Sequence, residues 1–411
     1  MRRLKDKINL PARTDEVIRL DFSPEEQQVY DWFSKMASER VRVLTGQAIG
    51  QDRIVGGKTM IHILRSILQL RQICAHGKDM LNEDDFADLQ GMTADTPIDL
   101  DSDDEDQPQV LQEKKAYEML YLMPEGNSDN CARCNCKLGA IEVDDPESDR
   151  QDDVIWYMAR CFHTYCPGCI KWLRNEQNGC DVCARFDKAS RVELRRKRAD
   201  MEQESRVGKN KGGTGKIIPD ERYTGPHTKT RALVEELLAN KERSAMCPAE
   251  PPLKSVVFSG WTTHLDLIQI ALDSAGITYT RLDGKMTRAA RNAAIDAFRE
   301  DHSVQVILVI ITAGGLGLNL TAGNSVFVME PQFNPAAEAQ AVGRVHRLGQ
   351  TRCVRTVRFI MKDSFEEKIL HLQDKKKKLA SLSLDRDPND KMADRTEAAR
   401  QRLMDLRSLF K

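Results

Sequence analysis

The chain has 411 residues, 40% of them hydrophobic and 30% charged, which is enough apolar content for more than one folded domain. Its 62 basic and 63 acidic side chains nearly cancel, so any surface that binds nucleic acid must be local. No stretch approaches the ~20 apolar residues of a membrane span, and the opening MRRLKDKINLPARTDE lacks the apolar core of a secretion signal, so we expect an intracellular protein without a membrane partner.

The first predicted region, residues 1–82, is helical. Ser23 and Pro24 have the form of an N-cap followed by a first-turn proline, and apolar residues recur near helical spacing from Ile61 to Leu70. The region contains a Gly-Lys-Thr sequence at residues 57–59. Asp52 stands where a phosphate-binding loop has its first glycine, so we interpret this match as a coincidence.

An acidic segment follows. The run DLDSDDEDQPQ groups acidic side chains with hardly any aliphatic residue, which predicts a disordered loop and then a short helix over residues 83–129.

Eight potential metal ligands lie within residues 130–187. They are Cys131, Cys134, Cys161, His163, Cys166, Cys169, Cys180 and Cys183. Zinc prefers four such ligands in a tetrahedral arrangement, so eight ligands in four pairs predict two closed structural sites, holding two zinc ions with no position open for catalysis. A module this small has little core of its own and needs the metal to fold. The remaining cysteines, Cys74, Cys136, Cys247 and Cys353, are expected to be buried or idle thiols.

The order of these ligands resembles the RING finger. In that family the first and third pairs share one zinc ion and the second and fourth share the other. The resemblance implies one site of Cys131, Cys134, Cys166 and Cys169 and another of Cys161, His163, Cys180 and Cys183. It also implies a groove for a ubiquitin-conjugating enzyme, and ubiquitin-ligase activity. The groove matches in part, because Arg133 and Asp181 replace an aliphatic residue and a proline and Trp172 stands one place early. A zinc-stabilised structural module without ligase activity is the alternative.

Residues 188–218 carry the basic run RVELRRKRADMEQESRVGKNKGGTGK. We expect a linker that begins as a helix and ends as a Gly-rich tether, and a DNA-contacting strip is the alternative.

From residue 219 to 383, short apolar runs such as VQVILVII alternate with amphipathic segments such as HLDLIQIALDSAG. This alternation predicts a parallel sheet flanked by helices. A helix carrying Lys375 to Lys378 and a helical tail over residues 384–411 are expected to end the chain. The lysine run is interpreted as a solvated helix end, with DNA contact as the alternative.

Two runs carry a second resemblance. ITAGGLGLNLTAGNSVFVMEPQFNPAAEAQAVGRVHRLGQ, from Ile311, and RLDGKMTRAARNAAIDAF upstream resemble the second RecA-like lobe of the Swi/Snf-type helicases of superfamily two, and GRVHR is closest to the SHPRH subgroup. The fold class implied is α/β: a RecA-like second helicase lobe with helices on both faces of a parallel sheet, a small zinc-stapled RING domain and a helical N-terminal region.

Physical reasons support particular site residues. Gly314, Gly315 and Gly317 let backbone amides approach a nucleotide or DNA phosphate at a strand-to-helix turn. Arg344 and Arg347 share one face near the end of the helix that Asn334-Pro335 is expected to start. Paired guanidinium groups suit phosphoryl transfer, which makes them arginine-finger candidates. Surface ion pairs are the alternative for these arginines.

The resemblance implies further roles. Gln340 and Gln350 would flank the arginines at the nucleotide cleft, while Thr321 would lie toward the DNA. Lys285, Arg288 and Arg291 follow Asp283-Gly284 at a helix start and are placed for phosphate contact, although helix capping by Thr287 explains part of this pattern.

The function implied is the C-terminal lobe of a nuclear, ATP-dependent double-stranded DNA translocase of the chromatin-remodelling or DNA-repair type. The implied partners are double-stranded DNA or chromatin, a ubiquitin-conjugating enzyme and a first RecA-like lobe. The phosphate-cradling Gly-Lys-Thr/Ser loop and the acidic pair for magnesium belong to that first lobe, and we recognise neither here. We therefore expect ATP with magnesium to be used only together with that lobe. A non-catalytic adaptor that binds a conjugating enzyme, DNA or chromatin is the alternative.

Overall fold

The chain forms two compact units in a computed structural model. Unit 1 comprises Met1–Asp31, Arg71–Met80 and Ile217–Ser381, and unit 2 comprises Trp32–Leu70, Leu81–Lys216 and Leu382–Lys411. The structure describes residues 10–46, 57–81, 111–126, 129–137, 154–159, 161–171, 180, 191–196, 198–199, 201, 225–283, 286–311, 317–382, 404–406 and 408–410.

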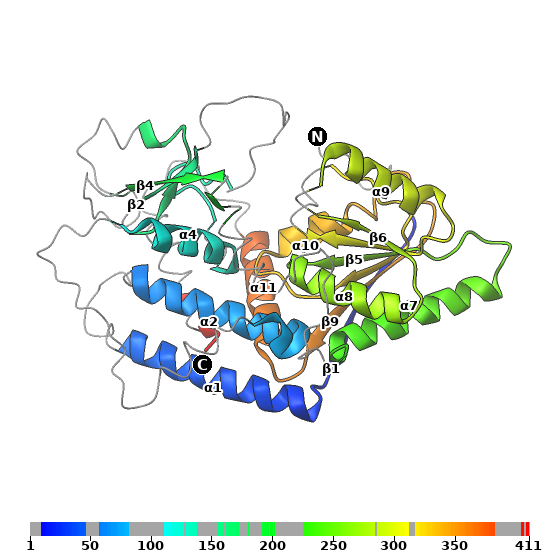
Figure 1. The fold of residues 1–411 in the computed structure, drawn as a ribbon, viewed down its shortest axis with the longest axis horizontal. Coiled ribbons are helices and arrows are strands. Elements are labelled where there is room, and N and C mark those ends of the chain that lie inside the picture. The colour runs from blue at the N-terminus through cyan, green and yellow to red at the C-terminus, as the bar shows by residue number, and fades with distance from the viewer. Residues whose placement is uncertain are drawn as a thin grey trace, which may run out of the picture. The chain divides into compact units, whose positions relative to one another are not determined.

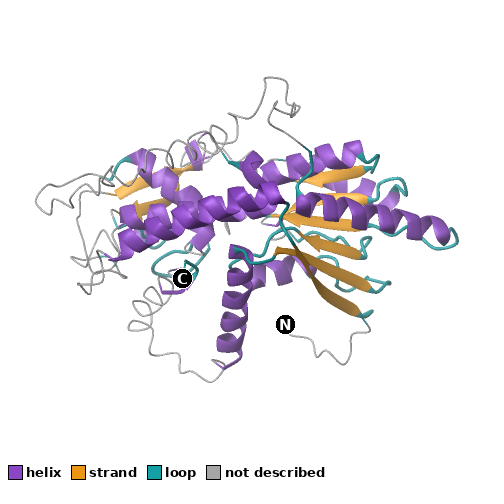
Figure 2. Ribbon diagram, turned by 90° about the horizontal axis from the view of Figure 1, so that it is seen from below, coloured by secondary structure: helices purple, strands orange, loops and turns teal. Residues whose placement is uncertain are grey.

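Unit 1 is built on a parallel sheet of six strands in the order β1-β9-β8-β5-β7-β6. Figure 2 shows these strands side by side, with helices packed along them. The strands are β1 (Arg13–Leu20), β5 (Ser255–Ser259), β6 (Tyr279–Leu282), β7 (Val306–Ile310), β8 (Ser325–Val328) and β9 (Val354–Met361).

Helices cover both faces of this sheet. Successive residues of a strand point to opposite faces, so neighbouring residues pack against different helices. Val256 and Phe258 of β5 pack with Phe298 of the helix α9, whereas Val257 between them packs with α7 and α8. Figure 1 shows α9 on one side of the sheet and α7 and α8 on the other. The helices are α7 (Thr228–Met246), α8 (Thr262–Ser274), α9 (Arg288–Glu300), α10 (Pro335–Val342) and α11 (Phe365–Leu382). The predicted fold class is confirmed.

Two predicted helix starts are also confirmed. The Thr287 side chain accepts a hydrogen bond from the backbone N–H of Ala290 at 3.2 Å, at the start of α9. The Asn334 side chain accepts one from Ala336 N–H at 3.0 Å, with Pro335 in the first turn of α10. Each side chain satisfies a backbone donor that has no partner inside its helix.

A strand that the sequence did not predict joins this sheet at its edge. β1 pairs with β9 over all eight of its residues. Ile18 and Leu20 of β1 pack into the core on the α7 and α8 side, and Arg355 of β9 donates to Glu16 at 2.8 Å and to Glu236 at 2.6 Å.

The predicted helices follow as α1 (Pro24–Gly46) and α2 (Gly57–His76), and α2 leads into the short 3-10 helix η2 (Gly77–Met80). The Gly-Lys-Thr sequence is therefore the first turn of α2.

Unit 2 contains a small antiparallel sheet in the order β3-β2-β4, formed by β2 (Val154–Ala159), β3 (Thr164–Tyr165) and β4 (Arg191–Arg195). β4 corrects the expectation that the basic segment begins as a helix. Leu194 of β4 is fully buried and pairs with Trp156 of β2, while its neighbours Glu193 and Arg195 are exposed. An alternation of period two suits a strand, and burial of Leu194 outweighs the helix preference of the charged residues.

The short helix expected after the acidic segment is α4 (Glu113–Leu122), followed by the 3-10 helix η3 (Met123–Gly126). The Tyr117 hydroxyl of α4 accepts a hydrogen bond from Arg195 N–H at 2.8 Å, so α4 packs beside β4. The acidic residues 101–106 and the Gly-rich tether lie outside the described residues. Among the described helices, none combines the length and the apolar character of a membrane span.

Candidate metal centres and nucleotide-facing edge

The first cysteine pair lies on a tight turn. Cys131 N–H donates to Cys136 O at 2.8 Å, Asn135 N–H donates to Cys131 O at 2.9 Å, and Asn135 adopts a φ of 59°. Asparagine tolerates this left-handed conformation better than most residues. The turn is fixed to β3, because Ala132 N–H donates to Thr164 O at 2.8 Å. The Cys131 and Cys134 side chains therefore face the segment that follows β3.

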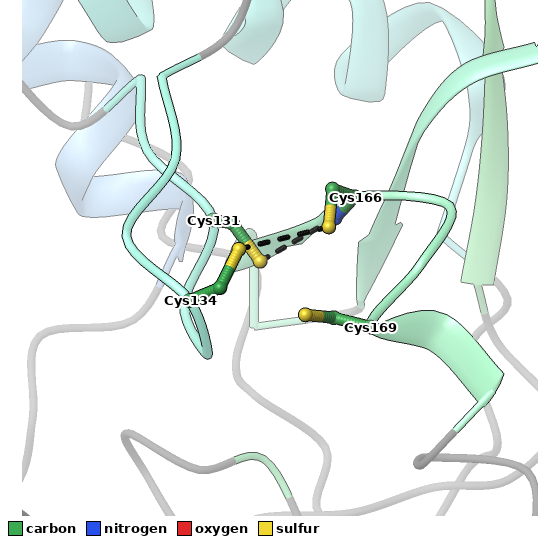
Figure 3. A group of neighbouring side chains, drawn as sticks. All are labelled: Cys131, Cys134, Cys166 and Cys169. Atoms are coloured by element: carbon green, nitrogen blue, oxygen red, sulfur yellow. Dashed lines mark hydrogen bonds between the residues drawn. The ribbon is translucent and has the colours of Figure 1, made fainter.

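That segment supplies the third pair. Cys169 N–H donates to Cys166 O at 2.9 Å, which closes a turn that puts both thiols on one side. The sulfur atoms of Cys131, Cys134, Cys166 and Cys169 all lie within 4.8 Å of one another, and Figure 3 shows them converging on one point. The Cys134 and Cys166 sulfur atoms are 3.7 Å apart. A tetrahedral site with metal–sulfur bonds of about 2.3 Å separates its sulfur atoms by about 3.8 Å.

The second and fourth pairs form a separate group. Cys161 and His163 lie in the turn between β2 and β3, where Phe162 has a φ of 62° and Ala159 N–H donates to His163 O. His163 Nδ1 lies 3.2 Å from Cys161 Sγ and 3.4 Å from Cys180 Sγ. The Tyr165 hydroxyl donates to Cys180 Sγ at 3.1 Å. Cys183, the fourth predicted ligand, lies outside the described residues.

The structure thus brings the described ligands together in the alternating order that the RING resemblance implies. Thiolates and imidazole suit a soft or borderline divalent ion, so both groups could hold a metal ion. Cys136 was predicted to be an idle thiol, but its sulfur atom lies 3.2 Å from that of Cys134. Cys136 follows Cys134 after one residue, whereas paired cysteine ligands usually have two residues between them. The ligand spacing therefore did not predict a contact for Cys136.

In unit 1, the predicted arginines lie beside the end of the Gly-rich segment. Leu320 N–H donates to Arg344 O at 3.0 Å, and Arg347 Nη1 donates to Leu318 O at 3.1 Å. Both arginine side chains are half-buried. Gly317 has a φ of 68°, a conformation that favours glycine. Gly314 and Gly315 lie outside the described residues.

The arginines are not on a helix, which corrects one expectation. α10 ends at Val342, and the chain continues in tight turns in which Arg344 N–H donates to Ala341 O and Gln350 N–H donates to Arg347 O, both at 3.0 Å. In this turn the Arg344 main-chain carbonyl and the Arg347 guanidinium group both contact the Leu318–Leu320 backbone.

The two glutamines differ in their surroundings. Gln340 is exposed in the last turn of α10. Gln350 is 5% exposed, and its amide nitrogen donates to Gly323 O at 2.8 Å and Val345 O at 3.2 Å, while its oxygen accepts from Thr351 N–H and Arg352 N–H. These four hydrogen bonds use the full capacity of the Gln350 amide. Its position is therefore structural here, and its nucleotide contact stays a prediction.

The predicted DNA-facing residues lie at the start of α9 and after Gly317. Arg288 is the exposed first residue of α9, and Arg291 is half-buried one turn later. Thr321 is half-buried, and its N–H donates to Asn319 Oδ1 at 3.4 Å. Lys285 lies outside the described residues. Since β6 and β7 are parallel, the segments after them share the carboxyl edge of the sheet, where ligands bind in open α/β folds.

A buried polar network at the same edge was not predicted. Glu330, which follows β8, accepts hydrogen bonds from Ser259 Oγ and Gly260 N–H, both at 2.9 Å, and contacts His264 Nδ1. All but Gly260 are at most 1% exposed. Burial raises the pKa of Glu330, but the charge and hydrogen bond of His264 outweigh it and hold that pKa below its usual value. The network joins residues some 70 positions apart, so no local pattern signals it.

Comparison with known proteins identifies relatives of the chain. The helicase conserved C-terminal domain matches residues 229–349. DNA repair protein RAD5A of Arabidopsis thaliana is 30% identical over 384 residues, which cover 91% of this chain and 33% of the relative. The helicase-like transcription factor of Homo sapiens is 30% identical over 391 residues, or 92% of this chain and 33% of the relative. DNA repair protein RAD5 of Gibberella zeae is 29% identical over 98% of this chain and 33% of the relative.

The chain thus spans about a third of the length of these curated relatives. Among solved structures, the C-terminal part of the Fun30 ATPase domain aligns over 98% of this chain and 99% of its own, with a TM-score of 0.50 and 18% identity. At this identity the likeness concerns the fold.

Proposed function

Because this chain belongs with the Swi/Snf-type, helicase-like proteins related to RAD5 and the helicase-like transcription factor, we propose that it is the second motor lobe of an ATP-driven double-stranded DNA translocase. The relatives' names, which include a SWI/SNF-related regulator of chromatin from Arabidopsis thaliana, support a role in DNA repair or chromatin remodelling, and therefore in the nucleus. The observation that carries the proposal is the hydrogen-bonded pairing of the Arg344–Arg347 turn with Leu318–Leu320, inside the matched domain.

In this proposal, Arg344 and Arg347 contact ATP that a first RecA-like lobe holds with magnesium. The planar guanidinium groups stabilise the charge that spreads over the phosphoryl oxygens in the transition state. Gln340 and the Gly-rich segment lie beside the nucleotide. Lys285, Arg288, Arg291 and Thr321 contact phosphates of the DNA backbone, which would make binding salt-dependent and insensitive to sequence.

The test combines this chain with a cognate first RecA-like lobe, mixed or fused, and measures phosphate release with and without double-stranded DNA. We expect DNA-stimulated hydrolysis that Arg344→Ala or Arg347→Ala lowers by about 10³-fold or more, as for other arginine fingers. Arg299→Ala is the matched control, since Arg299 is an exposed arginine whose partners are Asp296 and Glu300. If no combination restores hydrolysis, or if the two variants keep wild-type rates, the adaptor alternative is favoured.

We propose further that the two cysteine groups bind two zinc ions and form a RING that presents a ubiquitin-conjugating enzyme. The alternating grouping of Cys131, Cys134, Cys166 and Cys169 apart from Cys161, His163 and Cys180 supports this second function. Cys183 would complete the second site. Both ions would be structural, because four protein ligands leave no coordination position open.

Ligase activity is tested with ubiquitin, activating enzyme and a panel of conjugating enzymes. We expect ubiquitin chains with at least one conjugating enzyme, and their loss with Cys161→Ser. Cys247→Ser is the control, because Cys247 is an exposed thiol outside both groups. Silence of the wild-type chain across the panel would favour a structural zinc module.

A further inference from the structure

A third group of potential metal ligands lies in unit 1, away from the cysteines. His76 ends α2, Asp79 lies in η2, and His227 precedes α7. One ligand atom from each of these three side chains lies within 4.8 Å of the other two. Asp79 Oδ2 is 3.4 Å from His76 Nδ1 and 3.1 Å from His227 Nε2.

These separations match a metal site. With metal–nitrogen and metal–oxygen bonds near 2.1 Å, tetrahedral ligand atoms are separated by about 3.4 Å. Two imidazoles and a carboxylate form a common ligand set for zinc and related divalent ions, and they leave a fourth position for water.

The surroundings of His227 support this arrangement. Its Nε2 points to Asp79, and its other nitrogen, Nδ1, lies 2.9 Å from Glu26 Oε1. A histidine that binds a metal through one nitrogen usually donates its other N–H to a carboxylate, which fixes the ring. Glu26 is itself held in place, because it accepts from Thr228 N–H at 2.9 Å, Thr228 Oγ1 at 2.6 Å and Ser23 N–H at 2.8 Å.

The backbone is shaped to admit the His227 ring. Gly77 has a φ of 57°, and a Cβ atom at this position would lie 2.2 Å from His227 Cε1. Only glycine lets the imidazole lie this close to the chain between His76 and Asp79. Glycine here therefore serves the placement of a side chain that is distant in sequence.

Charge favours a divalent ion at this place. The side chains of Asp79 and Glu26 are 7% and 8% exposed, and His76 is fully buried. Two buried carboxylates with two neutral imidazoles carry two negative charges, which one divalent cation balances.

We propose that His76, Asp79 and His227 bind a zinc ion in the helicase lobe, with Glu26 orienting His227. This site ties the end of α2 and the segment before α7 to the start of α1, all within unit 1. Its ligands are distinct from the proposed nucleotide-contacting residues and from the cysteine groups.

The test measures zinc per chain by mass spectrometry after the purified wild-type chain is saturated with zinc and passed over a weak chelating resin. Asp79→Asn and His227→Gln are each expected to retain one zinc ion fewer than wild type, while the two cysteine sites contribute equally to all samples. His302→Gln is the control, since His302 is an exposed histidine outside the group.

Equal zinc contents in wild type and both variants would overturn the proposal and leave His227 as a protonated bridge between two carboxylates. Should the variants fail to fold, anomalous diffraction at the zinc edge from the wild-type chain decides the question. A peak between the three side chains supports the site, and a zinc-saturated crystal with peaks at the cysteines alone contradicts it.

Discussion

Glu330 is a buried carboxylate that joins the ends of two neighbouring strands. It accepts hydrogen bonds from Ser259 and Gly260, which end and follow β5, and it contacts His264 of α8. The network lies at the carboxyl edge of the sheet, close in sequence to Gln332 and to the start of α10. It therefore fixes the part of unit 1 from which the arginine turn projects.

Glu330→Gln should destabilise the lobe by about 3–5 kcal/mol at neutral pH, because the buried His264 and Ser259 lose the charged carboxylate that they contact. The pKa of Glu330 is lowered on folding, so its contribution is present above the unfolded value of 4.5 and is lost as pH falls through the folded pKa. The difference between variant and wild type, measured by urea unfolding at several pH values, should shrink below pH 4.5. The exposed carboxylate variant Glu300→Gln should show no such difference. A constant gap across the acid range would contradict this account.

Individual ligand residues differ in how far the sequence reveals them. The cysteines are predictable, because three of the four ligand pairs are cysteines with two residues between them, and a thiol pair on a turn has few other roles. His76 and His227 are separated by 151 positions, and their neighbours Asp79 and Glu26 look like ordinary helix-end carboxylates. Only the fold brings these four side chains together, so a search by spacing cannot find them.

Most helices and strands of the lobe follow from local patterns, and the exceptions have physical reasons. β5, β7 and β8 are short apolar runs buried on both faces, which is the pattern of a parallel strand. β1 lies at the edge with mostly exposed, charged residues, and its apolar positions are too few to signal a strand. β4 is hard to predict for the same reason, because Leu194 is its one fully buried residue within a basic segment.

The two cysteine turns and β3 should depend on metal as one element. Cys134→Ser removes one ligand of the first group, and we expect faster hydrogen–deuterium exchange in residues 129–137 and 164–171 because these turns have little apolar core. Strands β5 to β9 of unit 1 should keep their protection. Cys247→Ser serves as the matched thiol control. Unchanged exchange in both cysteine turns would argue against a metal that holds them.

At the level of the entire chain, the proposed motor chemistry requires a first lobe in addition to this one. The sequence holds no Gly-x-x-x-x-Gly-Lys-Thr/Ser loop, since the one Gly-Lys-Thr lacks the first glycine and opens α2. Purified chain with ATP, magnesium and double-stranded DNA is therefore expected to release no phosphate above background. Robust release that Arg347→Ala abolishes would show that this chain binds and hydrolyses ATP by itself.

The pairing of β1 with β9 has a consequence for how the protein is made. β1 leaves the ribosome before its partner strand, which is synthesised more than three hundred residues later. At ~5–20 residues per second this delay is about 15–70 s, during which β1 has no neighbour. Its charged residues, RTDEVIRL, suit a strand that must wait in solvent without recruiting a wrong partner. The sheet of unit 1 can thus reach its final width only after β9 has been synthesised.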